Sequence, residues 1–336
     1  MASTVNSAFS SFLTNSVNLA PQRVTAARNS RDAMFERINN LKGFLPLAKS
    51  YHMQFGSFAR GTKIRPIDDI DLIICLSGGG LQECTSSGWD DYKIKLSDTT
   101  SVFKQYCDVS YPSYYGYGYN PTYYLNSNKI KNAFKSALWA EHDCSKAELH
   151  SRGEAVTLKF TSYEWNFDIV PAFCVSDYYL IPNGTGGWKK TNPKLDRDRV
   201  KIINSKCGGY ALNLVRIVKY WNRRQTMATM PSYLLEAMVM NYCEGASDFS
   251  QFVDMEFANF LKYLINNIFN CVSDPKGIQG NINTLSYSQK QSIYQRASSD
   301  YTKACNAIYA ETQEKDHPKS IRIWREIFGG EFPAYG

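Results

Sequence analysis

The stretch "QFGSFARGTKIRPIDDIDLIICL" (residues 54–76) places a Gly-Ser pair and three aspartates directly before an apolar run. The run predicts a buried strand over residues 70–76. Side chains two apart in a strand point to the same face, so Asp69 and Asp71 share a face and Asp68 is expected to be a turn residue. Buried carboxylates cost several kcal/mol unless a cation meets them, so the sequence implies a cation beside this strand.

Two adjacent carboxylates repel each other, and a pair of divalent metal ions is the usual resolution. Mg²⁺ suits the pattern because it takes oxygen ligands and shares its shell with substrate phosphates. We therefore expect two Mg²⁺ ions, with Mn²⁺ as an alternative, although a lone Asp-x-Asp pair is more often simply solvated. Gly56-Ser57 favours the metal site, because the backbone of such a turn can approach a triphosphate and Ser57 can donate to it. By itself, this pair is also typical of an ordinary turn.

A third carboxylate for such a site is Asp168 in "WNFDIVPAF" (165–173). Its apolar neighbours predict a strand that is buried on at least one side, where an unpaired aspartate would be costly. We interpret Asp168 as a metal ligand or general base; the alternative is a structural carboxylate with its own partner. Asp168 lies 97 residues after Asp71, so only the fold could bring the two together.

The remaining pattern predicts an α+β fold. An N-terminal helical spine (4–17 and 22–41) precedes a mixed region in which "EAVTLKF" (154–160) pairs with residues 165–173. Glycine, serine and turn residues predict loops over 77–91 and 181–198. Further helices are predicted over residues 127–142, 208–224, 231–245, 250–271 and 287–311. The domains expected from this order are a core over 1–204 and a C-terminal helical lobe over 205–336.

Composition narrows the class of protein. The chain has 336 residues, 43% of them apolar, so it forms one large domain or two that share an interface. The net charge of +7 fits either an anionic partner or a generally basic face. Nine cysteines without a C-x-x-C pair indicate free thiols in a reducing compartment, and we expect a cytoplasmic protein. No apolar run reaches the length of a membrane span, and the N-terminus is not a secretory signal.

The quoted stretch, with "FDIVPA" (167–172), resembles the nucleotidyltransferases of the polymerase-β superfamily. Within that superfamily it looks most like the bacterial cGAS/DncV-like nucleotidyltransferases (CD-NTases) and the oligoadenylate synthetases. "WREIFGGEFP" (324–333) is similar to the C-terminal end of bacterial CD-NTases. The resemblance implies a nucleotidyltransferase core, a mixed sheet flanked by helices, packed on a C-terminal helical lobe that completes the nucleotide pocket.

The resemblance also points to residues of the C-terminal half. "LVRIVKYWNRR" (214–224) is similar to the family helix whose lysine holds the triphosphate, which is Lys219 here. "MPSYLLEAMV" (230–239) is similar to the segment lining the donor nucleotide, with Ser232 and Tyr233 at the matching positions. On the residues alone, Lys219 is equally typical of a surface lysine on an amphipathic helix and Tyr233 of a core residue.

The function implied by the resemblance is synthesis of a cyclic di- or trinucleotide messenger from nucleoside triphosphates, with release of pyrophosphate, in bacterial anti-phage (CBASS) signalling. The implied catalytic residues and metal ligands are Asp69, Asp71 and Asp168. The implied nucleotide-binding residues are Gly56, Ser57, Lys219, Ser232 and Tyr233. The alternatives are a template-independent nucleotidyltransferase that makes linear oligonucleotides and a non-catalytic nucleotide- or RNA-binding scaffold.

The expected partners follow from the same resemblance. The substrates are nucleoside triphosphates (ATP, GTP, UTP or CTP), and a separate effector binds the product. The zinc insertion of animal cyclic GMP-AMP synthase needs clustered Cys and His residues, which are missing from this sequence, so we expect no obligatory DNA partner. We also expect a monomeric protein. The terminal Gly336 suits conjugation by a ubiquitin-like machinery, although an ordinary tail fits as well. The tyrosine-rich segment 110–124 either stacks on nucleobases or forms a surface loop.

Overall fold

The computed structural model describes the chain except residues 1, 85–87, 112–120, 142–143, 145–146 and 225. The described residues group into two compact units. Unit 1 comprises Met1–Val24, Ala59–Pro66 and Leu195–Gly336, and unit 2 comprises Thr25–Phe58 and Ile67–Lys194. The predicted boundary at residue 204 stays a prediction, but the N-terminal helix and the segment after Gly56-Ser57 group with the C-terminal helices rather than with the sheet.

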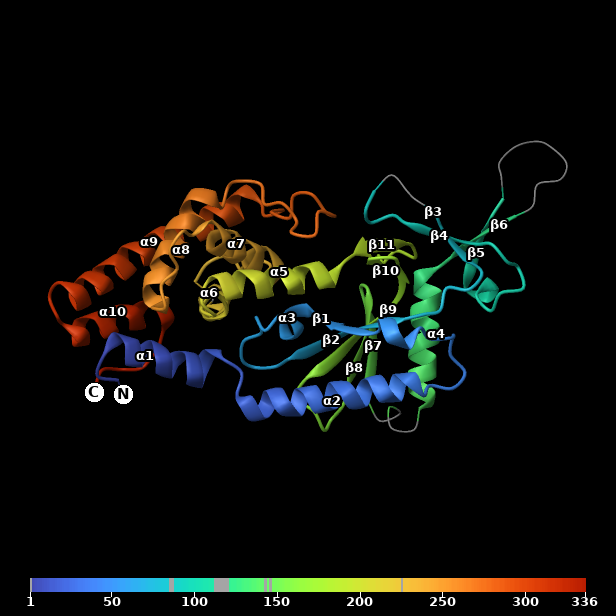
Figure 1. Ribbon diagram of the computed structural model, residues 1–336, viewed down its shortest axis with the longest axis horizontal. Coiled ribbons are helices and arrows are strands. Elements are labelled where there is room, and N and C mark those ends of the chain that lie inside the picture. Colours follow the sequence, from blue (N-terminus) through green and yellow to red (C-terminus); the bar gives the residue numbers. More distant parts are fainter. Residues whose placement is uncertain (1, 85–87, 112–120, 142–143, 145–146, 225) are drawn as a thin grey trace. The chain divides into compact units, whose positions relative to one another are not determined.

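Unit 2 contains two sheets with their helices (Figure 1). Its strands are β1 (Met53–Phe55), β2 (Asp69–Cys75), β3 (Leu81–Cys84), β4 (Lys93–Leu96), β5 (Cys107–Ser110), β6 (Thr122–Leu125), β7 (Glu148–Arg152), β8 (Ala155–Lys159), β9 (Asn166–Val175), β10 (Tyr178–Pro182) and β11 (Trp188–Thr191). Its helices are most of α2 (Pro21–Asn39), α4 (Ser127–Ala140), the start of α3 (Gly56–Ala59) and the short 3-10 turns η2 (Lys49–Tyr51) and η3 (Lys104–Tyr106).

The main sheet is built around β2 and β9. The strand order is β1-β2-β9-β10-β11, with β8 also paired to β9 and β7 paired to β8. β2 and β9 run parallel, whereas β1 is antiparallel to β2 and β8 is antiparallel to β9. Helix α4 packs against β7, β8, β9 and β10. A second sheet has the order β3-β4-β6-β5.

Strand β2 changes its environment along its length. Ile70, Leu72 and Ile74 are fully buried, as their spacing predicted. Ile73 and Cys75 are also fully buried and join another cluster of apolar side chains, so the second half of the strand is covered on both faces. Burial on both faces is typical of a central strand with a parallel neighbour. The half-exposed face is therefore confined to the start of β2, where the aspartates lie.

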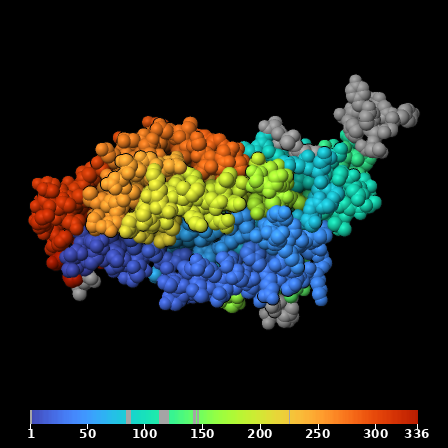
Figure 2. Space-filling model, viewed as in Figure 1, coloured from blue at the N-terminus to red at the C-terminus, as the bar shows by residue number. Residues whose placement is uncertain are grey.

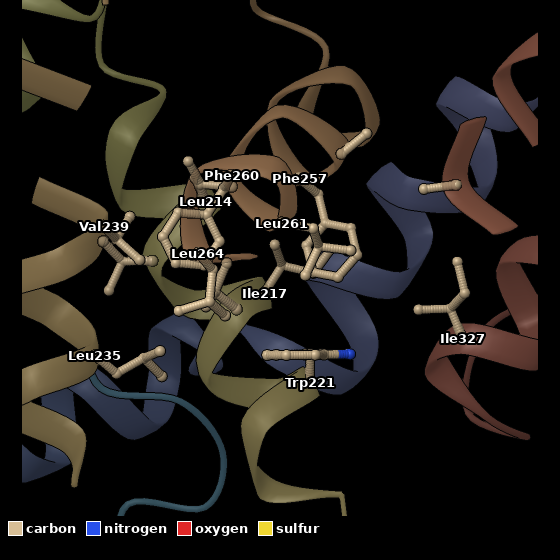
Figure 3. Close-up of a cluster of buried hydrophobic side chains, with 14 of the residues drawn as sticks. Leu214, Ile217, Trp221, Leu235, Val239, Phe257, Phe260, Leu261, Leu264 and Ile327 are labelled. Carbon is tan, nitrogen blue, oxygen red and sulfur yellow. The ribbon is translucent and has the colours of Figure 1, made fainter. Parts of the chain in front are cut away.

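Unit 1 is helical. It contains α1 (Val5–Phe12), which continues into the π-helical turn η1 (Leu13–Val17), and α5 (Pro193–Lys206), α6 (Ala211–Arg223), α7 (Ser232–Gly245), α8 (Val253–Asn267), α9 (Tyr287–Thr312) and α10 (His317–Phe328). One apolar face of α6 packs against α7, α8 and α10 (Figure 3). The α6 residues on that face are Leu214, Ile217 and Trp221, whose spacing of three to four residues is that of an amphipathic helix.

A buried polar contact also joins α6 to α9. The indole N–H of Trp221 donates to Asp300 Oδ2 over 2.8 Å, and Arg296 Nε donates to the same oxygen over 2.7 Å. Asp300 is fully buried, and the arginine and the indole both bind its Oδ2, whereas its buried Oδ1 accepts no hydrogen bond from the described residues.

The two ends of the described chain meet within unit 1. Ala2 N donates to Ala334 O over 3.0 Å, and Gly336 N donates to Ala2 O over 3.3 Å. In the space-filling view the N-terminal residues, in blue, lie beside the C-terminal residues, in red (Figure 2). These backbone bonds hold the last residues against the start of α1.

The fold class and the long helices agree with the sequence predictions, but strands β4, β5, β6 and β7 and the single turn α3 were not predicted as elements. The expected loop over 77–91 contains strand β3, and the turn-rich segment 181–198 contains the end of β10, strand β11 and the start of α5. Helix α10 was not predicted as an element. Residues 112–120 of the tyrosine-rich segment lie outside the described residues. Within the part of the chain that the structure describes, none of the helices combines the length and apolar character needed to cross a membrane.

Candidate active site

The parallel pairing of β2 with β9 places Asp71 directly opposite Asp168, and Asp69 opposite Asn166. Neighbouring strands lie about 4.8 Å apart and paired residues point to the same face. Asp71 and Asp168 are therefore side by side despite their separation in the chain, and Asp69 lies two residues earlier on the same face. All three are half-buried. Asp68, expected to be a turn residue, is exposed and lies just before the strand but not in a turn, since its carbonyl accepts a hydrogen bond from Asn166 N over 2.9 Å.

Gly56 lies against the carboxylate of Asp71. Phe55, the last residue of β1, is paired with Asp71, and the chain then enters the single helical turn α3 at Gly56. Gly56 has a φ of +74°, and a Cβ atom at this position would lie 1.8 Å from Asp71 Oδ2. Only glycine leaves room for this carboxylate, so the Gly-Ser segment and the aspartate strand meet at Gly56 and Asp71.

The neighbouring strand β8 supplies a partner for Asp168. Thr157 is paired with Asp168 across the antiparallel ladder, and its hydroxyl donates to Asp168 Oδ1 over 2.6 Å. This hydrogen bond fixes the orientation of the carboxylate. The spacing of residues within β8 gave no signal of this contact, which depends on the register of the two strands.

The aspartates fit a magnesium site in donor type and in backbone placement. Carboxylate oxygens are the ligands that Mg²⁺ prefers, and Asp69, Asp71 and Asp168 share one face of adjacent strands. Their side chains do not form a preformed cage: among the described residues, no group of three His, Cys, Asp or Glu side chains is arranged to hold a metal ion. The Asp71 carboxylate lies against Gly56 and that of Asp168 is held by Thr157.

The nucleotide-binding candidates of the C-terminal half lie in unit 1. Lys219 of α6 is 8% exposed, and its amine contacts Glu236 Oε1 at 2.5 Å and donates to Thr62 O over 3.1 Å. Arg60 Nε donates to the other Glu236 oxygen over 2.9 Å. Glu236 thus joins a lysine of α6 and an arginine of the segment 59–66 through one buried carboxylate on α7.

The charges in this cluster shift one another's protonation. Burial lowers the pKa of Lys219 below its ordinary value of 10.5, Arg60 and Lys63 act in the same direction, and Glu236 opposes them. Burial alone would raise the pKa of Glu236, but Arg60 and Lys219 outweigh it and hold that pKa below 4.5. The pKa of Arg60 is raised because Glu236 outweighs the effect of its burial.

Tyr233 is surrounded by charged side chains. Its hydroxyl donates to Asp196 Oδ1 over 2.8 Å and lies 2.9 Å from Asp274 Oδ1. Lys276 Nζ donates to the hydroxyl oxygen over 2.6 Å and lies 4.0 Å from the ring centroid. Burial, followed by the two carboxylates, raises the pKa of Tyr233, so the hydroxyl stays protonated. Ser232 is exposed at the first position of α7.

A well-bonded loop carries Lys276 to Tyr233. Asp274 Oδ2 accepts hydrogen bonds from Ile278 N over 3.2 Å and Gln279 N over 3.0 Å. Lys276 also pairs with Asp274 Oδ1 at 3.2 Å and with Asp196 Oδ2 at 3.5 Å. The loop is therefore rigidly built, and the position of Lys276 over the tyrosine ring is fixed from both sides.

The sequence reasoning missed Arg60, Glu236 and the charged partners of Tyr233. Glu236 could have been found, because it is the only charged residue in the run "YLLEAMVM" (233–240), and a carboxylate among buried helix positions needs a cationic partner. Asp196 and Lys276 carry no such signal. They approach Tyr233 from distant parts of the chain, where nothing in the local pattern marks them.

Comparison with known proteins bears on the family of the chain. Residues 3–91 match the model of the Second Messenger Oligonucleotide or Dinucleotide Synthetase domain. A probable cyclic nucleotide synthase of Bacillus cereus (strain VD146) is 38% identical over 100% of this chain and 99% of its own length. A cyclic AMP-AMP-AMP synthase of an Acinetobacter species is 25% identical over 57% of each chain.

The fold has a counterpart among solved structures. The structure of CdnC from E. coli MS115-1 with ATP covers 97% of this chain and 98% of its own, with a TM-score of 0.66 and 17% sequence identity. That similarity supports the nucleotidyltransferase fold, and the full-length relative supports the family. The strand-borne aspartates, the domain match and the relatives lead to one conclusion: the chain is a nucleotidyltransferase of the cyclic nucleotide synthase (CD-NTase) family.

Proposed function

We propose that this enzyme joins nucleoside triphosphates into a cyclic di- or trinucleotide and releases one pyrophosphate for each bond formed. The observation that carries the proposal is the register that sets Asp71 opposite Asp168, with Gly56 against the Asp71 carboxylate. This arrangement gathers carboxylates beside a Gly-Ser segment, which is what phosphoryl transfer to a hydroxyl requires.

The aspartates have distinct proposed roles. Asp69, Asp71 and Asp168 would hold two Mg²⁺ ions, or Mn²⁺ in their place, and bound metal would supply charge stabilisation for the reacting phosphate. Asp168 would accept the proton of the acceptor hydroxyl, with its carboxylate oriented by Thr157. The acceptor oxygen bonds to the α-phosphorus, the bond from the α-phosphorus to the bridging oxygen breaks, and pyrophosphate leaves. The same reaction within the linear product closes the ring.

The remaining residues would position the donor triphosphate. Gly56 lets backbone approach the phosphates, Ser57 donates a hydroxyl to them, and Lys219 supplies a positive charge. Ser232 and Tyr233 would line the donor nucleotide. Because the hydroxyl of Tyr233 is held by Asp196 and Lys276, its contribution to that lining would come from the ring.

The decisive experiment is synthesis from the four triphosphates with Mg²⁺, followed by phosphatase treatment. We expect pyrophosphate release and a phosphatase-resistant product, because a cycle has no terminal phosphate. A phosphatase-sensitive product would replace the proposal with linear oligonucleotide synthesis. No pyrophosphate with either Mg²⁺ or Mn²⁺ would favour a nucleotide-binding scaffold. The double variant Asp69→Ala/Asp71→Ala should keep the fold, by circular dichroism, and lose the product.

The choice of bases is testable in the same assay. The relatives are named for products that contain AMP, so we propose ATP as one substrate. Omitting one radiolabelled triphosphate at a time identifies the others. Loss of product only when ATP is omitted would indicate an adenine-only messenger, and product that survives the omission of ATP would contradict this assignment.

We also place the enzyme in bacterial anti-phage (CBASS) signalling, with a separate effector that responds to the product and with the protein acting as a cytoplasmic monomer. The support is the family alone. Protection of a bacterial host against phage should require Asp69 and Asp71 in the synthase. Gly336 is also proposed as a conjugation site through its carboxylate, while its N–H donates to Ala2 O. Mass spectrometry of the protein from infected cells would detect an isopeptide at that glycine.

A further inference from the structure

One carboxylate in unit 1 organises two cations that come from different elements. Glu236 lies on α7 among buried apolar residues, and its side chain is 4% exposed. It contacts Arg60, from the segment that follows Gly56-Ser57, at 2.9 Å and Lys219, from α6, at 2.5 Å. Without Glu236, two buried like charges would lose the one carboxylate that both contact.

The contacts fix where the lysine lies. The amine of Lys219 is bound on one side by Glu236 and on the other by the carbonyl of Thr62, which belongs to the same segment as Arg60. The side chains of Arg60 and Lys219 are 12% and 8% exposed, so neither has the freedom of a surface cation. Glu236 therefore sets the position of Lys219 relative to the chain that connects the Gly-Ser segment to β2.

We propose that Glu236 is a positioning residue, which together with Arg60 holds Lys219 in place for the triphosphate of the donor nucleotide. This inference rests on the proposed function, in which Lys219 binds that triphosphate. A buried ion pair by itself is weak evidence for stability, because burial offsets much of the attraction between the charges. The arrangement of Arg60 and Lys219 around one buried anion is better suited to fixing the position of Lys219 for an anionic ligand.

The electrostatics also give Glu236 a chemical role. Burial, Arg60 and Lys63 all favour the neutral form of the Lys219 amine and lower its pKa, and Glu236 is the group that opposes them. Removal of the carboxylate would lower the pKa of Lys219 further. The lysine would then lose its proton, and with it its attraction for phosphate, at a lower pH.

A double-mutant cycle tests the inference with inorganic tripolyphosphate as the probe, measured by calorimetry with Mg²⁺ present. Tripolyphosphate carries no base, so the result does not depend on which nucleotide is used. We expect Glu236→Gln to weaken binding at least about 10-fold, as truncation of a buried charge pair does. In the Lys219→Met background the same change should alter binding less than about twofold, because it acts through the lysine.

The pH dependence of tripolyphosphate binding provides a second readout, which would not change if Glu236 only stabilised the fold. The ionisation of tripolyphosphate affects binding to every variant equally. The ratio of variant to wild-type dissociation constants therefore reports only the ionisation of groups on the protein. For Glu236→Gln this ratio should increase from pH 7 to pH 9, because Lys219 deprotonates earlier in the variant. In the Lys219→Met background the ratio should be independent of pH.

Asp300→Asn is the matched control. Asp300 is another buried carboxylate of unit 1 that accepts from an arginine and a second donor, so its loss should lower stability and leave tripolyphosphate binding unchanged. If Glu236→Gln does not fold, Arg60→Gln/Glu236→Gln removes one charge of each sign and replaces it in the cycle.

The outcomes separate the two proposals. Unchanged binding in Lys219→Met would overturn the triphosphate role of Lys219 and leave the aspartates to be judged by synthesis. Two other results would overturn the positioning role alone, provided that Lys219→Met weakens tripolyphosphate binding. One is unchanged binding in Glu236→Gln. The other is that the losses of binding free energy in Glu236→Gln and Lys219→Met simply add in the double variant.

Discussion

At the scale of single residues, the contact between Gly56 and Asp71 leads to a prediction. In Gly56→Ala the new methyl group would overlap the Asp71 carboxylate, 1.8 Å away, and force it to turn. The variant also places alanine at a φ of +74°, a strain of roughly 1–2 kcal/mol. Displacing a catalytic group by about 1 Å can cost about 100-fold, so we expect pyrophosphate release to fall at least that far.

Gly153→Ala separates the two effects. Gly153 has a φ of +52° in the turn between β7 and β8, and a Cβ atom there would meet nothing within 4 Å. It should share the backbone strain, seen as a lower melting temperature, and keep its activity. Equal loss of activity in both variants would mean that backbone strain, rather than the Asp71 contact, explains the effect at Gly56.

A second prediction concerns the hydrogen bond from Thr157 to Asp168. Thr157→Val keeps the shape of the side chain and removes the donor, so the carboxylate loses its fixed orientation. We expect the initial rate of pyrophosphate release to fall about 10-fold and the Mg²⁺ concentration for half-maximal rate to rise, as for other changes beside metal ligands. Thr157→Ser restores a hydroxyl and should recover most of the rate, whereas a valine variant with wild-type kinetics would contradict the role.

For single residues, the sequence predicted which face of the strand each aspartate occupies, but it did not predict their partners on neighbouring strands. The period of two in "DIDLIICL" (69–76) correctly separated Asp68 from Asp69 and Asp71. The position of Asp168 opposite Asp71 depends on a register between strands far apart in the chain, which local periodicity cannot supply. Thr157 was unpredictable for the same reason.

At the scale of elements, Glu236 links α7 to the segment 59–66 and to α6. Its pKa lies below 4.5, so the paired carboxylate stabilises the fold fully above that pH and loses its contribution as the pH falls through its lower folded-state pKa. Glu236→Gln should cost roughly 3–5 kcal/mol at pH 7. The difference in urea midpoint between wild type and variant should become smaller below pH 4.5. If this difference is constant from pH 7 to pH 3, the ion pairs of Glu236 do not cause the difference in stability.

Long periodic elements were predicted from the sequence, and short edge elements were not. Helices α6 and α9 bury residues at spacings of three to four over several turns, and Pro231 and Ser232 mark the start of α7. β3 and β11 have four residues each and lie among turn residues, so their own pattern is too short to distinguish a strand from a loop. Their partners in the sheets determine their structure.

At the scale of the whole molecule, the thiols report how well both cores exclude solvent. Among the described cysteines, five are buried: Cys75, Cys107, Cys144, Cys207 and Cys243. Two are exposed: Cys271 and Cys305. Burial raises the pKa of Cys75 to about 12 and that of Cys107 to about 11, so almost no reactive thiolate forms near neutral pH.

We therefore expect iodoacetamide at pH 8 to label Cys271 and Cys305 first and the five buried cysteines only after unfolding in urea. Peptide mass spectrometry identifies each labelled residue. Cys243, which is fully buried in the unit 1 core, is the most sensitive reporter. Its rapid labelling in the native protein would show that this core opens under native conditions.

The pairing of Asp71 with Asp168 also bears on when the enzyme becomes active during its synthesis. The two paired residues are 97 positions apart in the chain, and closing a loop of that length costs about 4 kcal/mol of chain entropy in addition to a constant. A nascent chain on the ribosome carries Asp69, Asp71 and the Gly-Ser segment long before β9 emerges. The carboxylate pair can form only after β9 has been made, about halfway along the chain, so chains that end before Asn166 would lack the proposed metal site.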